Sequence, residues 1–195
     1  MIQDPDLELV KRSQAGDKAA FGKLVSAYYE MVYAVTFGVV SNHEAAKDVT
    51  QEVFLKVYRE IGKFQGQSKF KTWLYRVAVN AGIDTRRRRH PETPIDPTGA
   101  GAEEDEQPLF VVEDKTAGPR DRAWHSELGQ LIQQALETLS ADHRAVLVLR
   151  EWEGASYEEI AEALGIGLGT VMSRLFYARK KMAEILKAKT RDKRP

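Results

Sequence analysis

Two stretches of the chain carry residue types that could bind nucleic acid. Residues 64–89 mix aromatic side chains with lysines and arginines. Aromatic rings can stack on unpaired bases while nearby cations meet phosphates. Residues 156–181 are typical of a helix-turn-helix, in which the second helix lies in the DNA major groove. Here the outer positions of the second helix carry hydroxyl and basic groups. The plainer interpretations are a buried aromatic core with a solvated helix end, and a helical hairpin with a solvated basic face.

No pattern in the chain predicts catalysis. There is no cysteine, which excludes disulfides, thiolate metal ligands and thiol nucleophiles. The histidines lie far apart, without the spacing of metal ligands, at His43, His90, His125 and His143. A glycine-rich phosphate loop and a nucleophile motif are also missing. We therefore expect a protein that is not an enzyme and needs no cofactor or metal.

Charge is strongly segregated along the chain although the net charge is zero. Residues 62–90 hold 8 Lys+Arg against 1 Asp+Glu, or +7, and residues 164–195 hold 9 against 2, again +7. Residues 91–127 hold 3 against 10, or −7. Clustered cations neutralise phosphates, so the two basic segments predict two separate nucleic-acid contacts.

The positions of apolar residues predict an all-α bundle in residues 1–90. The spacing indicates helices over 5–16, 18–40, 44–61 and 72–89. Asp17 is placed to cap the second helix, and Ser41 with Glu44 is expected to form a capping box for the third. No strand-like alternation occurs in this part.

Residues 91–126 change character and predict a flexible acidic linker. They hold five of the seven prolines and a single apolar island at 109–112, which could dock elsewhere. Four further helices follow, with Ser140 capping one of them and a basic, frayed tail over 187–195. The expected fold is thus all-α, with two small helical domains over 1–90 and 127–187.

Capping signals sharpen the predicted helix-turn-helix. Ser156 and Glu159 form a capping box, and Gly165 supplies the left-handed residue that ends the first helix. The second helix is expected from about Leu168.

The helix at 44–61 has an informative polar stripe. Asp48, Gln51, Glu52 and Lys56 follow one another at i, i+3, i+4 and i+8, so they share one face. Such a stripe is either a partner-binding surface or a solvated face.

Five motifs in fixed order resemble bacterial sigma factors of the extracytoplasmic-function (ECF) group. They are DVTQEVF at 48–54, FQGQSKFKTWLYRVAVN at 64–80, LSADHR at 139–144, SYEEIA at 156–161 and GTVMSRL at 169–175. The resemblance covers about 15–89 and 128–182, which is most of the chain outside the linker.

The resemblance implies a protein that binds core RNA polymerase, directs it to promoter DNA and helps open the duplex. It implies polymerase-core contacts at Asp48, Gln51, Glu52, Phe54 and Ile61. It implies contacts with the −10 element, including a base flipped into a pocket, at Phe64, Lys69, Trp73, Arg76, Asn80, Arg86 and Arg87. It implies −35 contacts at Thr170, Ser173, Arg174, Phe176, Tyr177, Arg179 and Lys180.

The same resemblance implies an anti-sigma factor as a further partner. The absence of a signal peptide and of a long apolar run predicts a cytoplasmic protein without membrane insertion. The alternative function is a helix-turn-helix transcriptional regulator without sigma activity, which would usually dimerise on a palindromic site.

Overall fold

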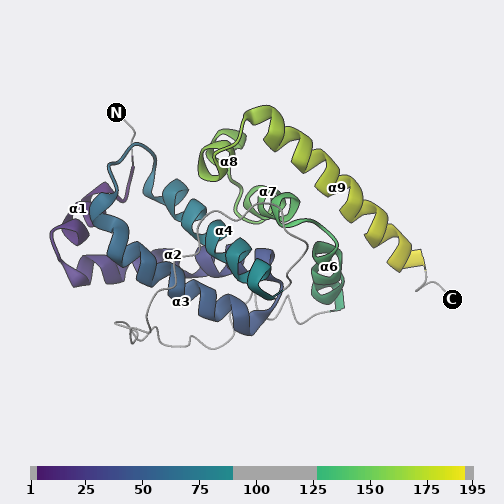
Figure 1. Ribbon diagram of the computed structural model, residues 1–195, viewed down its shortest axis with the longest axis horizontal. Coiled ribbons are helices and arrows are strands. Elements are labelled where there is room, and N and C mark those ends of the chain that lie inside the picture. Colours follow the sequence, from purple (N-terminus) through teal and green to yellow (C-terminus); the bar gives the residue numbers. More distant parts are fainter. Residues whose placement is uncertain (1–3, 90–126, 192–195) are drawn as a thin grey trace.

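A computed structural model describes residues 4–89 and 127–191, and both ranges are helical (Figure 1). The N-terminal half holds α1 (Leu7–Gln14), α2 (Lys18–Val40), α3 (His43–Glu60), the 3₁₀ turn η1 (Ile61–Lys63) and α4 (Phe70–Arg89). The C-terminal half holds α6 (Glu127–Glu137), α7 (Ala141–Glu151), α8 (Tyr157–Leu164) and α9 (Leu168–Arg191). These two ranges contain no strand, and the predicted all-α class is confirmed.

Side-chain caps set several helix boundaries where the sequence places them. The carboxylate of Asp17 accepts the N–H of Ala20 in the first turn of α2, and the hydroxyl of Ser140 accepts the N–H of His143 in the first turn of α7. Ser156 and Glu159 form the predicted capping box of α8, with both reciprocal hydrogen bonds present. Gly165 ends α8 at φ 66°, the left-handed conformation that favours glycine.

The predicted capping box at Ser41 and Glu44 is wrong. Ser41 ends α2 instead, with a left-handed φ of 58°. Asn42 caps α3, because its side chain accepts the N–H of Ala45 at 2.9 Å. One polar residue thus closes a helix and the next one opens another.

Two other boundaries differ from the prediction. Helix α4 begins at Phe70 rather than Thr72, because the carboxylate of Asp4 accepts the Phe70 N–H at 2.7 Å. Helix α9 continues to Arg191, through part of the tail that was expected to fray. The predicted linker, 91–126 with its apolar island 109–112, lies outside the described residues, so the division into two domains stays a prediction.

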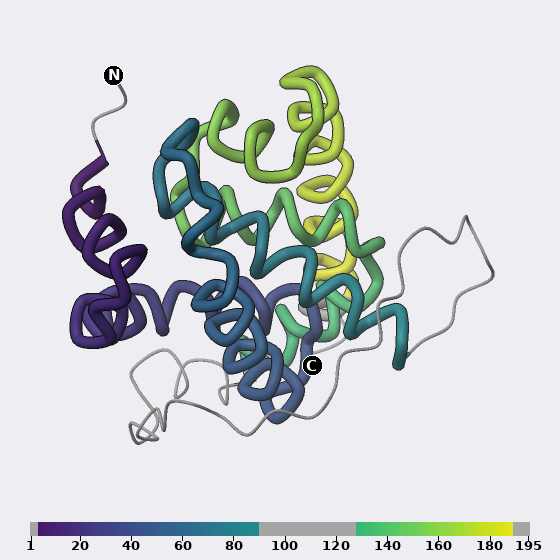
Figure 2. The backbone as a smooth tube through the Cα atoms, turned by 60° about the vertical axis from the view of Figure 1, so that its left-hand side comes forward, coloured from purple at the N-terminus to yellow at the C-terminus, as the bar shows by residue number. Residues whose placement is uncertain are grey.

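The two halves share one continuous hydrophobic core. It runs from Val10 in α1 to Ala178 in α9 without a break between the halves. Figure 2 shows the helices of the two halves lying against one another. Helix α2 packs on α7, and α4 packs on α8. The sequence predicts both helical bundles but not this contact between them.

Backbone approach between α2 and α7 requires a glycine. A Cβ added to Gly38 would lie 2.5 Å from Val148 Cγ2 and 2.6 Å from the ring of Trp152. Because real Cβ atoms do not approach that closely, any larger residue at position 38 must shift the side chains of Val148 and Trp152 or the helices themselves.

Arg144 of α7 is fully buried and caps the end of α2. One terminal nitrogen, Nη1, donates to the Val39 carbonyl at 2.8 Å and to the Ser41 hydroxyl at 2.7 Å. Burial, together with the nearby charge of Arg86, lowers the pKa of Arg144 to about 10, so the side chain stays cationic at neutral pH. A cation at a helix C-terminus is favoured by the exposed carbonyl dipoles. Gln133 of α6 adds a third contact here, donating to the Ser41 carbonyl at 2.7 Å.

Candidate polymerase and nucleic-acid interfaces

The polar stripe predicted on α3 lies on the surface. Asp48, Gln51 and Glu52 are all exposed, so they are accessible to a partner. Phe54 and Ile61 are buried in the core. In this conformation these two support the helix instead of facing outward.

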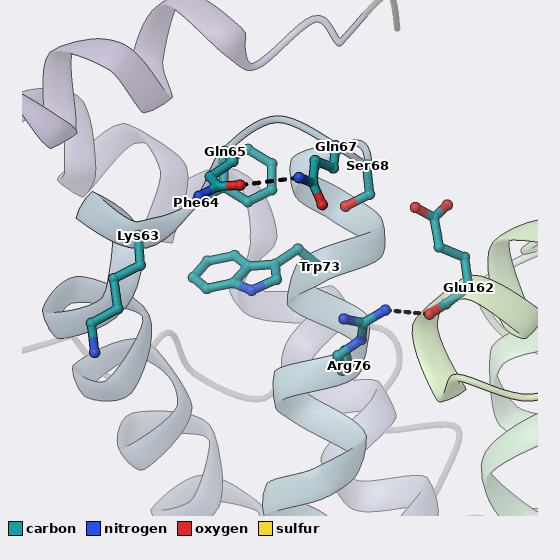
Figure 3. A pocket seen from close by; sticks show the side chains of 8 residues that line it. All are labelled: Lys63, Phe64, Gln65, Gln67, Ser68, Trp73, Arg76 and Glu162. Atoms are coloured by element: carbon teal, nitrogen blue, oxygen red, sulfur yellow. Dashed lines mark hydrogen bonds between the residues drawn. The ribbon is translucent and has the colours of Figure 1, made fainter.

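A ring cluster lines a cavity between η1 and α4 (Figure 3). The ring centroids of Phe64 and Trp73 lie 5.3 Å apart, and Phe70 lies 6.0 Å from Phe64. The cavity has a volume of about 210 Å³ and is lined by Lys63, Phe64, Gln65, Gln67, Ser68, Trp73, Arg76 and Glu162. Aromatic walls with amide, hydroxyl and cationic groups suit an unpaired base, which needs both stacking and hydrogen bonds to its edge.

Helix α4 aligns four of the predicted −10 residues on one outward stripe. Trp73, Arg76, Asn80 and Arg87 are separated by three, four and seven residues, which is the spacing of a single helix face. Asn80 and Arg87 are exposed, and Trp73 is half-buried at the cavity. Arg86, also predicted, is half-buried beside this stripe.

The C-terminal half contacts this same surface. The guanidinium of Arg76 donates to the carbonyls of Ala163 at 3.1 Å and Glu162 at 2.5 Å, near the end of α8. Figure 3 shows the bond to Glu162. Lys69 pairs with Glu159 at 3.1 Å. Two predicted DNA contacts are therefore engaged within the chain, and no sequence pattern indicated that Glu162 would line the cavity.

Glu159 carries two tasks, because it closes the α8 capping box and meets the other half. Its hydrogen bond from the Ser156 backbone N–H, and then the pair with Lys69, hold the pKa of Glu159 below its ordinary value despite partial burial. The carboxylate is therefore ionised at neutral pH and the contact between the halves is charged.

The outward face of α9 remains accessible. Its inner side buries Val171, Leu175 and Ala178. The outer side presents polar and aromatic groups together, namely Thr170, Ser173, Phe176, Tyr177 and Lys180. The exposed fraction is 63% for Phe176 and 59% for Tyr177, and Met172 adds a third exposed apolar side chain at 53%.

Two of the predicted −35 residues are engaged by α7. Arg174 pairs with Asp142 at 2.7 Å, and Arg179 pairs with Glu151 at 2.6 Å. The carboxylate of Glu151 raises the pKa of Arg179. These pairs fix the two arginines at the flanks of α9, so the free centre of the face is hydroxyl and aromatic.

The described ranges contain no cluster of three or more His, Asp or Glu side chains that could hold a metal ion. Among the helices of these ranges, none has the length and apolar character needed to cross a membrane.

Two family models match the chain, Sigma-70 region 2 over residues 24–91 and Sigma-70, region 4 over residues 129–182. The first covers the polar stripe of α3 together with the aromatic cavity, and the second covers α7, α8 and the outward face of α9. The chain belongs to the sigma-70 family of RNA polymerase sigma factors.

Curated relatives narrow this class. The RNA polymerase sigma-H factor of Pseudomonas aeruginosa is 36% identical over 195 residues, which is 98% of this chain and 99% of that protein. The ECF RNA polymerase sigma-E factor of Escherichia coli strain K12 is 38% identical over 178 residues, 90% of this chain and 91% of that protein. The predicted resemblance to the ECF group is confirmed, and with it the function of an alternative sigma factor in transcription initiation.

A solved structure shares the fold along most of the chain. It is the sigma factor RpoE from Bartonella quintana, in complex with the anti-sigma factor NepR. It is 25% identical with a TM-score of 0.61, and the match covers 86% of this chain and 96% of that one.

Proposed function

We propose that this protein binds core RNA polymerase through the exposed stripe of α3 and reads two promoter elements, one with each half. The carrying observation is that Trp73, Arg76 and Asn80 share one face of α4, and that Trp73 and Arg76 of this face line the aromatic cavity. The stripe Asp48–Gln51–Glu52 lies on a different helix, which supports simultaneous binding of polymerase and DNA. The protein would have no catalytic activity of its own, and would work in the cytoplasm with the polymerase.

In this proposal the N-terminal half captures the melted −10 strand. A base leaves the duplex and enters the cavity between Phe64 and Trp73, where ring stacking replaces its lost neighbours. Asn80 offers both a donor and an acceptor to a base edge, and the exposed Arg87 is placed for a phosphate. Phe54 and Ile61 hold α3 and η1 in position from the core.

The C-terminal half would read the −35 duplex with α9. Ser173 and Thr170 can bond base edges or phosphates, and Phe176 presents an apolar surface to the thymine methyl groups of the major groove. Arg174, Arg179 and Lys180 flank this centre and suit phosphates.

Promoter capture in this scheme requires the halves to separate at α4–α8. Arg76 and Lys69 contact α8 in the unbound protein, so DNA must replace those contacts with phosphates. Core polymerase supplies the binding energy for this exchange. An anti-sigma factor is the proposed opposing partner, supported by the complex in which the Bartonella quintana relative is seen.

Run-off transcription with purified core polymerase tests the proposal. We expect promoter-dependent transcripts only when the protein is added. The promoter would be selected by the holoenzyme from a DNA pool with randomised −35 and −10 segments. A protein that binds DNA without core polymerase and adds no transcription would contradict the proposal.

A charge reversal tests the polymerase contact separately. Glu52→Lys should weaken core binding at least about 10-fold. A polymerase surface that is complementary to the carboxylates of this stripe is basic, and the new lysine would repel it. Glu30→Lys is the matched control, since Glu30 is an exposed glutamate of α2 in the same half. Equal core affinity of the two variants would remove α3 from the assignment.

A further inference from the structure

The N-terminal segment 4–14 lies ahead of the region 2 match, which begins at residue 24. It nevertheless contacts both ends of the loop 64–69, hereafter the capture loop, which leads from η1 into α4 beside the aromatic cavity. Its helix α1 is anchored by Val10, which is buried in the core. A segment fixed in this way can hold the loop.

Gln14 holds the first end of the capture loop. Its side-chain amide donates one hydrogen bond to the Ile61 carbonyl at 2.9 Å and a second to the Phe64 carbonyl at 2.8 Å. Both donors of the amide are used, which fixes its orientation. The bonds span the point where the chain leaves η1, with Phe64 at φ −70° and ψ 115°.

Asp4 holds the other end. Its Oδ2 accepts the backbone N–H of Phe70 at 2.7 Å, at the start of α4. Its Oδ1 accepts the N–H of Asp6 at 3.0 Å, and the Asp6 carboxylate accepts the hydroxyl of Tyr28. The Tyr28 ring meets Phe70 edge-on, with centroids 5.7 Å apart, so the acidic turn and the aromatic cluster brace each other.

Between these two ends few contacts hold the capture loop, and the one that reaches another helix is the ion pair of Lys69 with Glu159 of α8. Gly66 adopts a left-handed φ of 69°. The loop's own side-chain bonds, Gln67 to Gln65 and Ser68 to the Lys69 carbonyl, are exposed. Solvated bonds of this kind contribute little to rigidity, so the anchoring of the ends decides where the cavity walls stand.

We propose that Gln14 and Asp4 are positioning residues that preorganise the cavity of Phe64 and Trp73 for an unpaired nucleobase of the promoter strand. Neither touches the base. Because they order the capture loop before the base enters, binding of the base loses less conformational entropy. The affinity for the flipped base is therefore raised, and that for the rest of the DNA is not. The inference rests on the proposed function and adds to it a recognition element outside the matched region.

The test compares the affinity of each protein variant for intact DNA with its affinity for DNA that carries an abasic site. Holoenzymes with wild-type protein, Gln14→Glu and Asp4→Ala are titrated with a fork-junction DNA whose single-stranded −10 segment the wild-type holoenzyme selected from a randomised pool. A second series carries one abasic site, moved along that segment. Gln14→Glu keeps the side-chain length but replaces both donors with an acceptor that faces two carbonyls.

Each variant loses two hydrogen bonds and should bind the intact DNA at least about 5-fold more weakly than wild type, the factor that corresponds to about 1 kcal/mol, the net strength of a single bond. At one abasic position wild type and variant should bind equally, because no base is left to capture. Asp4→Asn should recover most of the affinity, since its amide oxygen can still accept the Phe70 N–H. Glu8→Gln, an exposed residue of the same helix α1, is the control and should match wild type.

Three results would overturn the inference. The first is a loss of affinity that persists at every abasic position, which would mean general destabilisation. The second is an unchanged affinity of the variants for the intact DNA. The third is an equal loss of affinity in Glu8→Gln. A wild-type holoenzyme that selects no DNA and makes no transcript would instead contradict the proposed function, so the two failures are distinguishable.

Discussion

The two candidate DNA-reading surfaces differ in what covers them. On α4, Arg76 and the neighbouring Lys69 are engaged by α8 of the other half. On α9, Phe176 and Ser173 are exposed, and the helix packs on α6, α7 and α8 of its own half. In the unbound chain the centre of the candidate −35 face on α9 is therefore open, whereas part of the candidate −10 face on α4 contacts α8. This order suits a factor that should not capture melted DNA before polymerase arrives.

The contact between the halves also has two unlike sides. At α2–α7 it is apolar and tight, with Gly38 against Val148 and Trp152. At α4–α8 it is polar, with Arg76 and Lys69 on carbonyl and carboxylate groups. Phosphate oxygens can replace the acceptors on the polar side, whereas nothing in DNA replaces a buried apolar contact. Opening should therefore begin at α4–α8.

Imperfect hydrogen bonding limits the stability of the closed arrangement. Among the described residues, the buried side-chain polar atoms without a partner are the Tyr75 hydroxyl and Arg144 Nε. Arg144 lies between the halves. Burial raises the pKa of Tyr75, and the negative charges of Glu153 and Glu159 in the C-terminal half raise it further. Each unsatisfied group costs about 1–3 kcal/mol.

The largest effect should follow removal of the buried cation that joins the halves. Arg144→Leu leaves the Val39 carbonyl and the Ser41 hydroxyl without their donor. We expect a loss of about 3 kcal/mol in the free energy of unfolding, measured in urea, together with a larger radius of gyration by solution scattering. Arg150→Leu is the control, because Arg150 donates to Ala155 within its own half. A loss no greater than that of the control would show that Arg144 does not join the halves.

The next effect compares two glycines of the same helix. At Gly38 an added methyl group meets Val148 and Trp152, and at Gly22 it meets nothing within 4 Å. Gly38→Ala should lower the free energy of unfolding by about 2 kcal/mol through overpacking, while Gly22→Ala should raise it by up to about 1 kcal/mol through helix propensity. Chemical denaturation of both variants measures this difference. Equal shifts would mean that α2 and α7 do not approach closely in solution.

The accuracy of the sequence-based predictions differs between local and long-range features. Caps such as Asp17 and Ser156, and the glycine stop at Gly165, were predictable because each depends on neighbours within four residues. The predicted capping box at Ser41 was wrong because Ser41 ends α2, and the side chain of Asn42, the next residue, caps α3.

Long-range contacts were not predictable in the same way. Arg144 lies in one of the sequence motifs, yet its partners in the core are a carbonyl and a hydroxyl about a hundred positions away, on Val39 and Ser41. The same holds for Gln14, whose partners Ile61 and Phe64 are brought to it by the packing of α1 on η1. The motif residues themselves were found through the resemblance, and the exposed stripes of α3 and α4 follow from helical spacing.

A smaller effect on stability is expected at the exposed candidate −35 face of α9. Phe176→Ala removes an exposed ring, so the free energy of unfolding should stay within about 0.5 kcal/mol of wild type. Affinity of the holoenzyme for its selected −35 duplex should fall about 5-fold through lost groove contacts. Leu128→Ala, on an exposed leucine of α6, should change neither quantity. An unchanged duplex affinity for Phe176→Ala would exclude the ring from the reading face.

The smallest effect concerns pH and the polar side of the contact. The Ser156 N–H and then Lys69 lower the pKa of Glu159, so its stabilisation is complete at neutral pH and is lost as pH falls through its folded pKa, below the ordinary 4.5. The free energy of unfolding is measured in urea at pH 6 and at about pH 3. Its decrease between the two pH values should be about 0.5–1 kcal/mol smaller in Glu159→Gln than in wild type. Glu158→Gln changes an exposed neighbour in the same first turn and should keep the wild-type dependence. If Glu159→Gln keeps it too, the carboxylate does not hold the two halves together, and the cover over Arg76 rests on backbone carbonyls alone.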